Sequence, residues 1–359
     1  MPMDIELRRV ATPKAKPTDP LGFGLHFADH MFRMDYEAGP GWHRPRIEPY
    51  GPIPLDPAAS VLHYAQMAFE GMKALRGSDD RIRIFRPQEH ASRFRRSCSR
   101  LCIPPIDVSV FVEAIRELVA LEHAWVPSGE GKALYIRPFV IATEPFLGVR
   151  PSNRYAFFII LSPVGSYYAR GGQPVRIWVE RQATRAAPGG TGAAKTGGNY
   201  ASSLQATLRA RESGYDQVLW TDAHAHKFIE EVGTMNLFVR INDVVYTPPL
   251  NGTVLGGVTR DSVIQMLRDD GIVVKEVALS LDELREAHAN GTLKEIFGTG
   301  TAAVVTPVAE LGFQEDDLTV GDGAPGDVAT LVSKRLNDLQ RGRIPDVRGW
   351  TSVVVPRDG

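Results

Sequence analysis

Residues 188–200 read PGGTGAAKTGGNY, and this stretch decides how the rest of the chain is interpreted. Its single lysine, Lys195, stands among glycines, alanines and threonines. Helices and strands do not tolerate so many glycines, so the backbone follows a specific irregular path here. Small neighbours let a flat ligand approach the amine closely, and partial burial makes a lysine amine a better nucleophile. The stretch therefore suits a lysine that forms a Schiff base.

Composition alone leaves another interpretation of Lys195 open. A solvated lysine on a flexible surface loop has the same small, polar neighbours. A phosphate-binding loop of the GxxxxGK[ST] type is excluded, because Ala194 and not glycine precedes Lys195.

On both sides of this stretch, short strands and helices follow one another. Apolar patterns predict strands at 81–85, 132–143, 155–163, 175–180, 217–221, 227–232, 236–241, 244–247 and 272–279, and a strand–turn–strand over 295–308. They predict helices after Pro87 and at 109–123, 199–213, 259–270, 280–291 and 326–341, the fifth opening with a Ser280–Glu283 capping box. The many hairpins favour an α+β fold over a doubly wound sheet.

The helix after Pro87 is predicted to be amphipathic. Its apolar residues share one face, namely Ala91, Phe94, Cys98 and Leu101. Its arginines are expected to form a solvated basic face, namely Arg93, Arg95, Arg96 and Arg100.

The length of 359 residues corresponds to about two domains at roughly 150 residues each. The Gly-rich, aromatic stretch VGSYYARGGQP at 164–174 is the best linker candidate. The expected division is a mobile N-terminal arm at 1–20, a small domain at 21–163, the linker at 164–174 and a large domain at 175–359.

Composition excludes several classes of protein. A net charge of −1 argues against a nucleic-acid surface. Cys98 and Cys102 cannot form a disulfide framework and are expected to be reduced. Residues 1–20 lack the apolar core of a secretory signal, and no apolar run reaches membrane-spanning length. We expect a cytoplasmic protein that binds neither membrane nor metal.

Four further positions could carry chemistry, although each has a structural alternative. Glu231 stands between apolar residues on a predicted strand, where an edge-strand charge is the alternative. The segments 256–259 and 298–302 could present backbone N–H groups to an anion, or serve only as a helix cap and a hairpin turn. Arg86 could hold an anion in a two-pronged contact or be a surface charge.

Taken together, these stretches match the motifs of a known family. The chain resembles the branched-chain amino-acid aminotransferases of the fold-type-IV family, which use pyridoxal 5′-phosphate (PLP), from about residue 20 to about residue 350. The matching motifs are FADHM (27–31), HYAQMAFEGMKA (63–74), FRP (85–87), LYIRP (134–138), EPFLGV (144–149), residues 189–204, EEVGTMNLF (230–238), GGVTRDS (256–262) and FGTGTAAVVTPV (297–308).

The resemblance implies a two-domain, D-amino-acid-aminotransferase-like fold with PLP between the domains, and it implies a role for each matching residue. Lys195 matches the lysine that binds the cofactor covalently and moves the proton. The implied cofactor-binding residues are Lys195, Glu231 at the pyridine nitrogen, Tyr200 at the phenolic oxygen, Arg86, Val258, Thr259 and Thr301 at the phosphate, and Arg185 close by. The implied substrate-binding residues are Phe27, Tyr64, Phe69, Tyr135, Arg137, Tyr167, Thr301 and Ala302, with Leu147 and Val149 lent by the partner subunit of a homodimer.

The implied reaction is ping-pong transamination between Leu, Ile or Val and 2-oxoglutarate, which gives branched-chain 2-oxo acids and glutamate. Other fold-type-IV enzymes, the D-amino-acid aminotransferases and aminodeoxychorismate lyases, share the lysine and the glutamate and are the nearest alternative. A non-catalytic binding protein with the same fold is the other. Some mammalian members carry a CxxC pair where this chain has Ala303 to Thr306, so redox regulation of that type is not expected.

Overall fold

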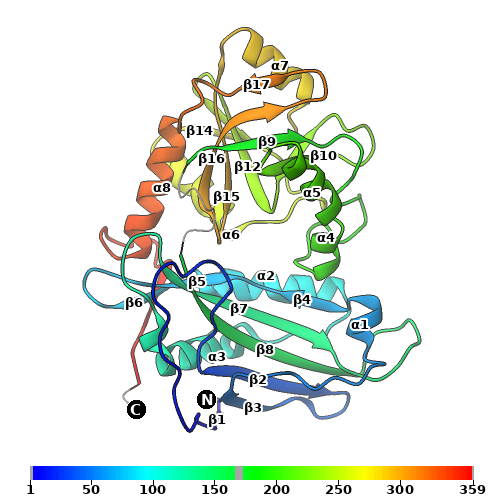
Figure 1. The fold of residues 1–359 in the computed structure, drawn as a ribbon, viewed down its shortest axis with the longest axis vertical. Coiled ribbons are helices and arrows are strands. Elements are labelled where there is room, and N and C mark those ends of the chain that lie inside the picture. The colour runs from blue at the N-terminus through cyan, green and yellow to red at the C-terminus, as the bar shows by residue number, and fades with distance from the viewer. Residues whose placement is uncertain (1–2, 166–172, 358–359) are drawn as a thin grey trace. The chain divides into compact units, whose positions relative to one another are not determined.

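The computed structural model describes residues 3–165 and 173–357 (Figure 1). The chain forms two compact units. Unit 1 comprises Met1–Tyr167, Ala194–Gly197 and Asn337–Gly359, and unit 2 comprises Tyr168–Ala193 and Gly198–Leu336. Each unit has its own sheet and its own core of buried apolar side chains.

The expected division of the chain differs from these units in two segments. Asn337–Gly359 belongs to unit 1, because β18 (Thr351–Val354) pairs antiparallel with β6 (Ile82–Phe85). Ala194–Gly197 also belongs to unit 1. The predicted mobile arm is partly structured, since β1 (Glu6–Leu7) pairs with β3 (Gly41–Pro49). Most of the predicted linker, 166–172, lies outside the described residues.

The sheet of unit 1 is antiparallel apart from the β1–β3 pair. Its strand order is β1, β3, β2 (His30–Glu37), β8 (Arg154–Val164), β7 (Ala133–Ala142), β5 (Met72–Arg76), β6 and β18, with β4 (Met67–Phe69) also paired to β7. β7 and β8 pair from Ala133↔Val164 to Ala142↔Tyr155, and most of their side chains are buried. Such continuous burial explains why both strands lack the apolar–polar alternation of a half-exposed sheet.

Two helices pack beside this sheet, α2 (Pro87–Arg100) and α3 (Val108–Leu121) (Figure 1). The ring of Phe157 on β8 lies 5.6 Å from that of Phe94 and 5.7 Å from that of Phe111, measured between centroids. This aromatic cluster joins both helices to the sheet. The short helix α1 (Ser60–Tyr64) and a 3-10 turn at His123–Trp125 complete the unit.

The predicted apolar face of α2 is confirmed, but its predicted basic face is wrong in one position. Ala91, Phe94 and Cys98 are buried. Arg93 is also buried, because it pairs with the fully buried carboxylate of Glu70. A charged side chain is buried only where a partner neutralises it, and this partner lies outside the helix.

The sheet of unit 2 contains a closed ring of strands. Its order is β11 (Ile229–Val232), β10 (Gln217–Thr221), β9 (Val175–Val179), β16 (Val304–Gly312), β15 (Leu293–Gly300), β12 (Met235–Ile241), β13 (Val244–Thr247) and β14 (Val273–Glu276). β17 (Asp317–Thr319) pairs with β16. Because β11 also pairs with β12, the strands from β11 to β12 close on themselves.

Five helices accompany this sheet in the described part of the chain. They are α4 (Gly197–Ala201), α5 (Leu204–Glu212), α6 (Val258–Asp269), α7 (Leu281–Ala289) and α8 (Asp327–Gln340), the last ending in unit 1. α5 packs on β10, α6 on β14 and β15, and α7 on β15. The single helix predicted at 199–213 is wrong, because the chain forms α4 and α5 there. The strand predicted at 272–279 is shorter, since only β14 is extended and paired.

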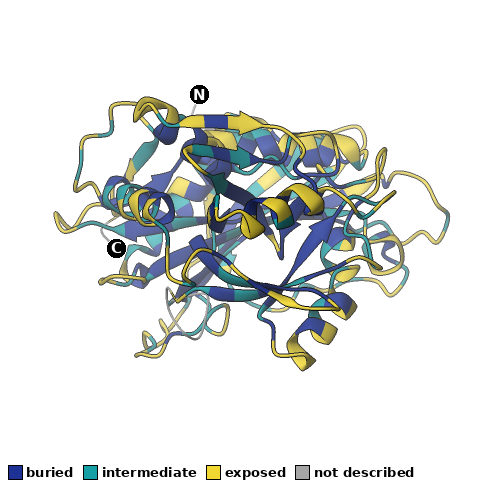
Figure 2. Ribbon diagram, turned by 90° about the horizontal axis from the view of Figure 1, so that it is seen from above, coloured by how far each residue is buried: buried dark blue, intermediate teal, exposed yellow. Residues whose placement is uncertain are grey.

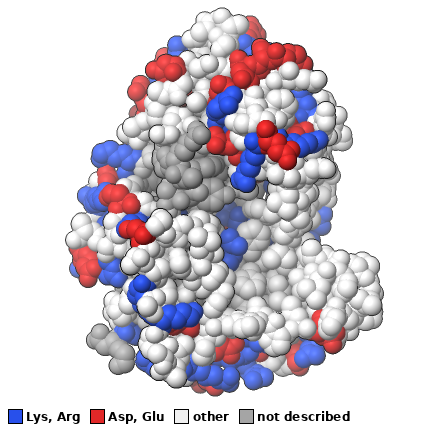
Figure 3. Space-filling model, viewed as in Figure 1, with Lys and Arg blue, Asp and Glu red and all other residues white. Residues whose placement is uncertain are grey.

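Buried residues are concentrated along the strands, and exposed residues along the helix surfaces and loops (Figure 2). Acidic and basic side chains are interspersed over the face shown in Figure 3, in line with the near-zero net charge. In the described part of the chain, no helix combines the length and the apolar character that crossing a membrane requires.

The capping box at α7 is confirmed and gives a test of the local structure. The Ser280 hydroxyl accepts from the Glu283 N–H at 3.2 Å, and the Glu283 carboxylate accepts from the Ser280 N–H at 2.8 Å. We expect Ser280→Ala to lower the free energy of unfolding by about 1 kcal/mol, as measured by urea denaturation. Ser213→Ala, at the exposed C-terminus of α5, is the control. Equal losses in the two variants would contradict the capping role.

Candidate active site

The segment around Lys195 is held in unit 1 by its backbone. The Phe69 N–H donates to the Lys195 carbonyl at 3.0 Å, and the Lys195 N–H donates to the Ser97 hydroxyl at 2.9 Å. The Thr196 hydroxyl donates to the Met67 carbonyl at 2.7 Å. Contacts with β4 on one side and α2 on the other therefore fix both ends of the lysine's peptide unit.

Three predicted pocket residues lie together next to this segment. The Lys195 Nζ lies 4.9 Å from the ring centroid of Phe69, and the Arg137 guanidinium also lies 4.9 Å from that ring. Arg137 donates to the Tyr135 hydroxyl at 3.1 Å. Tyr135 and Arg137 are two residues apart on β7, so they project from the same face of the strand. The structure thus brings Phe69, Tyr135, Arg137 and Lys195 into one cluster.

Glu70, the residue after Phe69, belongs to a buried ionic group next to this cluster. Glu70 is 0% exposed; it accepts from Arg93 at 2.7 and 2.9 Å and contacts His90 Nδ1 at 2.9 Å. Burial by itself raises the pKa of the Glu70 carboxyl, but the charge and hydrogen bonds of Arg93 and His90 hold that pKa well below its usual range. Sequence patterns gave no signal for this group beyond the presence of Glu70 in a matching motif.

Arg86 lies in the same unit, where β6 ends and α2 begins. It is the N-cap of α2, with a φ of 48°, and its side chain is buried. The guanidinium lies 4.9 Å from the ring centroid of Trp350, whose carbonyl accepts from the Arg86 N–H at 2.6 Å. The segment Asn337–Gly359 thus supports Arg86, and Arg86 is not the exposed surface charge that the sequence left open.

The other predicted pocket residues of unit 1 form separate contacts. Phe27 stacks on Tyr50 at 4.9 Å between centroids, and the Tyr64 hydroxyl donates to the Leu147 carbonyl. Leu147 is 60% exposed and Val149 is 86% exposed. Tyr167 lies outside the described residues.

In unit 2, Glu231 is buried and held at both carboxylate oxygens. One oxygen accepts from the Leu255 N–H at 2.8 Å and from the Asn236 amide at 3.3 Å. The other lies 3.1 Å from Nε of Arg185, which also donates to the Thr253 carbonyl. The structure therefore brings Glu231 and Arg185 together, and the edge-strand alternative for Glu231 is wrong because the side chain is only 3% exposed.

The two predicted anion-binding segments also lie in unit 2. Val258 and Thr259 are buried in the first turn of α6, whose N-cap Gly257 supplies no side chain. A Cβ on Gly257 would lie 1.9 Å from Oδ1 of Asn236, so only glycine fits there. Thr301 and Ala302 follow β15 and are partly exposed. Tyr200, in α4, is also partly exposed.

Comparisons with known proteins identify the family of this chain. A family model described as amino-transferase class IV matches residues 67–311. The branched-chain-amino-acid transaminase 1 of Bacillus subtilis (strain 168) is 53% identical, over 98% of this chain and 99% of its own. The chain belongs to the branched-chain amino-acid aminotransferase family.

Solved structures of this family share the fold of the aminotransferase described above. The branched-chain amino acid aminotransferase of Escherichia coli matches with a TM-score of 0.76 and 27% identity, over 91% of this chain and 99% of its own. The T.th. enzyme complexed with N-(5′-phosphopyridoxyl)-L-glutamate matches with a TM-score of 0.73 and 28% identity, over 89% and 98%. The predicted α+β, fold-type-IV class is thereby confirmed.

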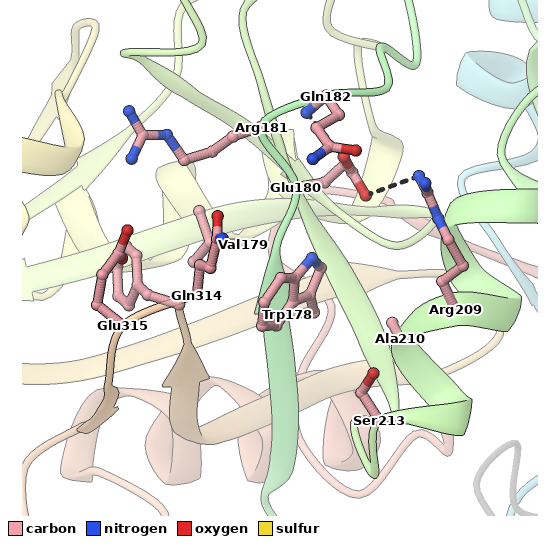
Figure 4. A pocket seen from close by; sticks show the side chains of 11 residues that line it. Trp178, Val179, Glu180, Arg181, Gln182, Arg209, Ala210, Ser213, Gln314 and Glu315 are labelled. Carbon is pink, nitrogen blue, oxygen red and sulfur yellow. Dashed lines mark hydrogen bonds and ion pairs between the residues drawn. The ribbon is translucent and has the colours of Figure 1, made fainter.

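A separate hollow lies in unit 2, away from the assigned residues of this aminotransferase. It has a volume of about 480 Å³ and lies between β9, α5 and the chain after β16 (Figure 4). Its Glu180 carboxylate accepts from the N–H groups of Gln182 and Ala183, at 2.8 and 2.9 Å, and lies 3.5 Å from Arg209. These contacts order the loop after β9, and the lining of the hollow includes none of the residues assigned to the reaction.

The buried Glu70–Arg93 pair predicts a large loss of stability when its charge balance is broken. We expect Glu70→Gln to lower the free energy of unfolding at pH 7 by roughly 3–5 kcal/mol, because Arg93 would stay buried without a counter-charge. Because the folded state lowers the Glu70 pKa, its contribution is present above about pH 4.5 and fades as the pH falls. Urea denaturation across that range measures both effects. The exposed Glu89→Gln on α2 is the control, and a pH-independent loss would contradict this account.

Proposed function

We propose that this protein transfers amino groups between branched-chain L-amino acids and 2-oxoglutarate, using PLP, in a ping-pong reaction that yields branched-chain 2-oxo acids and L-glutamate. The observation that carries the proposal is the fixed Lys195 segment, whose amine lies over Phe69 beside Arg137. The extent of the match to the Bacillus subtilis transaminase supports the choice of substrates.

The residues of the chain fit PLP in three respects. Lys195 supplies an amine on a segment of small residues. Glu231 supplies a buried carboxylate suited to a protonated pyridine nitrogen, and the N-terminal turn of α6 supplies N–H groups suited to a phosphate. The T.th. neighbour, solved with a phosphopyridoxyl compound, supports the same cofactor.

PLP, when bound, acts as an electron sink for the substrate Cα. Glu231 would lie at the pyridine nitrogen and keep it protonated; its carboxylate lies 3.1 Å from Nε of Arg185 and accepts from the Leu255 N–H. Lys195 takes the proton from Cα and returns it, as general base and then general acid. In the roles that the resemblance assigns, Tyr200 would donate to the phenolic oxygen. Arg86, Val258, Thr259 and Thr301 would hold the phosphate, and the turn at Thr301 and Ala302 would receive the substrate carboxylate.

The substrate pocket follows from the cluster beside Lys195. Phe69 and Tyr135 provide aromatic surface for an aliphatic side chain. The family resemblance assigns Phe27 and Tyr64 to the same pocket, and also Tyr167, which lies outside the described residues. One methylene changes binding in such a pocket by only about 1–3 kcal/mol, so Leu, Ile and Val are weakly separated. The guanidinium of Arg137 receives the distal carboxylate of glutamate. We also propose a homodimer, in which exposed Leu147 and Val149 contact the partner's pocket.

Substrate choice separates this proposal from the other fold-type-IV reactions. The purified protein should form glutamate from L-leucine and 2-oxoglutarate. Glutamate formed from D-alanine but not from L-leucine would reject the branched-chain reaction in favour of a D-amino-acid aminotransferase.

Removal of the lysine amine tests the role of Lys195. We expect Lys195→Ala to lose the visible absorbance of bound PLP and at least about 100-fold in kcat, because positioned proton transfer contributes roughly 10²–10⁴-fold. Absorbance and a glutamate-coupled assay measure the two effects. Lys275→Ala, an exposed lysine on β14, is the control. Full turnover in Lys195→Ala would reject the mechanism.

Arg137 predicts a difference between the two kinds of substrate. We expect Arg137→Met to raise KM for 2-oxoglutarate about tenfold or more, because a charge-assisted hydrogen bond contributes roughly 1.5–3 kcal/mol. KM for leucine should change much less, since its side chain carries no charge. Steady-state kinetics with each substrate varied in turn measure this. Equal changes in both KM values would show that Arg137 does not recognise the distal carboxylate.

A further inference from the structure

Glu230, which immediately precedes Glu231, is a buried carboxyl group with no part in the reaction described above. It is 4% exposed. Its Oε1 is hydrogen-bonded to the Thr253 hydroxyl. Its Oε2 is buried and has no hydrogen-bond partner among the described residues. An ionised carboxylate in such a place would leave half of its charge unsatisfied.

The balance of hydrogen-bond donors and acceptors around the Thr253 hydroxyl indicates whether Glu230 is protonated. The Thr253 hydroxyl lies against two oxygens, Oε1 of Glu230 and Oδ1 of Asn251, the second at 2.7 Å. The Asn251 atom is an acceptor, because the Thr253 N–H also points to it at 3.2 Å. One hydroxyl supplies one proton, so it satisfies only one of two acceptors. If Glu230 carries a proton, Glu230 donates to Thr253 and Thr253 donates to Asn251.

The surrounding charges favour the same form. Burial raises the pKa of Glu230; the hydrogen bond from Thr253 and the charge of Arg185 lower it, and the charge of Asp222 raises it again. Arg185 and Asp222 are the charged groups that face Glu230, besides Glu231 next to it on β11. Nε of Arg185 lies 3.1 Å from Glu231, so Arg185 already has an anionic partner.

We propose that Glu230 is held as a neutral carboxylic acid that donates to Thr253, and that it acts as a positioning residue for the Arg185–Glu231 pair. Thr253 links the two groups, since its hydroxyl binds Glu230 while its carbonyl accepts from Arg185. Two residues later, the Leu255 N–H donates to Glu231. A neutral Glu230 therefore orders the segment that holds the pair without competing for its charge.

Ionisation of Glu230 would have two consequences. The hydrogen-bond chain from Glu230 through Thr253 to Asn251 would lose the proton that Glu230 supplies. A second carboxylate would then attract Arg185 away from Glu231. For the reaction, and this step rests on the proposed function, Glu231 would become a poorer partner for the pyridine nitrogen as the pH rises.

Infrared spectroscopy of the purified holoenzyme tests the protonation state directly. We expect a carboxylic-acid C=O band at pH 7 that disappears at more alkaline pH and is absent from Glu230→Gln. Glu230→Asp should keep such a band at a shifted position. If Glu230→Gln does not fold, this shift still tests whether the band belongs to residue 230. The exposed Glu212→Gln on α5 is the control and should leave the band unchanged. The absence of any carboxylic-acid band from the wild-type protein at pH 7 would overturn the proposal.

The pH dependence of Tm gives a second, independent readout. A group whose pKa is raised in the folded state loses its stabilising contribution as the pH rises from its ordinary value of about 4.5 through its folded value. The Tm values of wild type and Glu230→Gln should therefore differ least below about pH 4.5. Above that pH, the Tm of wild type should fall progressively further below that of Glu230→Gln. If Glu230 were instead an ionised partner of Arg185, wild type would become progressively the more stable above pH 4.5.

Kinetics then connect this residue to the reaction. Glu230→Gln should move the alkaline limb of the kcat/KM profile for leucine to higher pH, which a purely structural role would not do. The infrared band and Tm require no amino-group transfer. A protein with the band but without transamination would reject the proposed function alone, and a transaminase without the band would reject only this proposal.

Discussion

The hydrogen bond from the Phe69 N–H to the Lys195 carbonyl is the constraint on which the reactive part of unit 1 depends. It adds the lysine segment to the end of β4, a strand of three residues paired to β7. Because the bond uses backbone atoms, it fixes the Cα from which the side chain starts and does not itself restrict the side-chain torsions. The lysine is therefore tethered at its Cα, and its side chain extends from a fixed point, as a group that collects and returns a proton requires.

Each unit contains a buried carboxylate that is paired with an arginine. Glu70 has Arg93 and His90 as partners and Gly71 N–H as a third donor, so both of its oxygens are bound within unit 1. Glu231 has Arg185 on one oxygen and N–H donors on the other. Neutralised pairs of this kind contribute little net stability, but breaking one is costly. They are therefore better understood as rigid supports for neighbouring residues than as sources of folding energy.

Local pattern predicted the long elements well, because period and capping depend only on near neighbours. β8, α3 and the Ser280 cap are examples. β2 and β3 were not predicted, because Arg33, Asp35 and Arg46 lie among their apolar residues. Asp35 pairs with Arg33 on its own strand and with Arg46 across the hairpin. Arg93 was placed on the surface for the same reason, since its partner Glu70 lies on another element. Long-range ion pairs are invisible to periodicity.

The site shows the same division between local and distant information. Lys195 stood out from its own neighbours, whereas the roles of Glu231 and Arg185 came only from resemblance to a family. Ser97, which accepts from the Lys195 N–H, carried no signal at all, because a serine on a helix has many ordinary explanations. Residues that act through another residue are recognised only when the distance between the two is known.

The adjacent glutamates of β11 show how one strand can hold two carboxyl groups in different states. The pairing of β11 with β10 shifts register at Glu230, from Trp220↔Glu231 to Thr221↔Ile229, so the regular alternation of side chains is interrupted there. Both carboxyl groups lie against the segment 251–255, but they contact different atoms of it. Glu231 has a guanidinium and an N–H donor, which stabilise a charge. Glu230 has a hydroxyl already needed by Asn251, and an oxygen with nothing to bind among the described residues. Two carboxyl groups in such different surroundings can take distinct roles. The charge is then confined to the one glutamate that needs it, because the segment 251–255 contacts Glu230 through a hydroxyl and Glu231 through a backbone N–H.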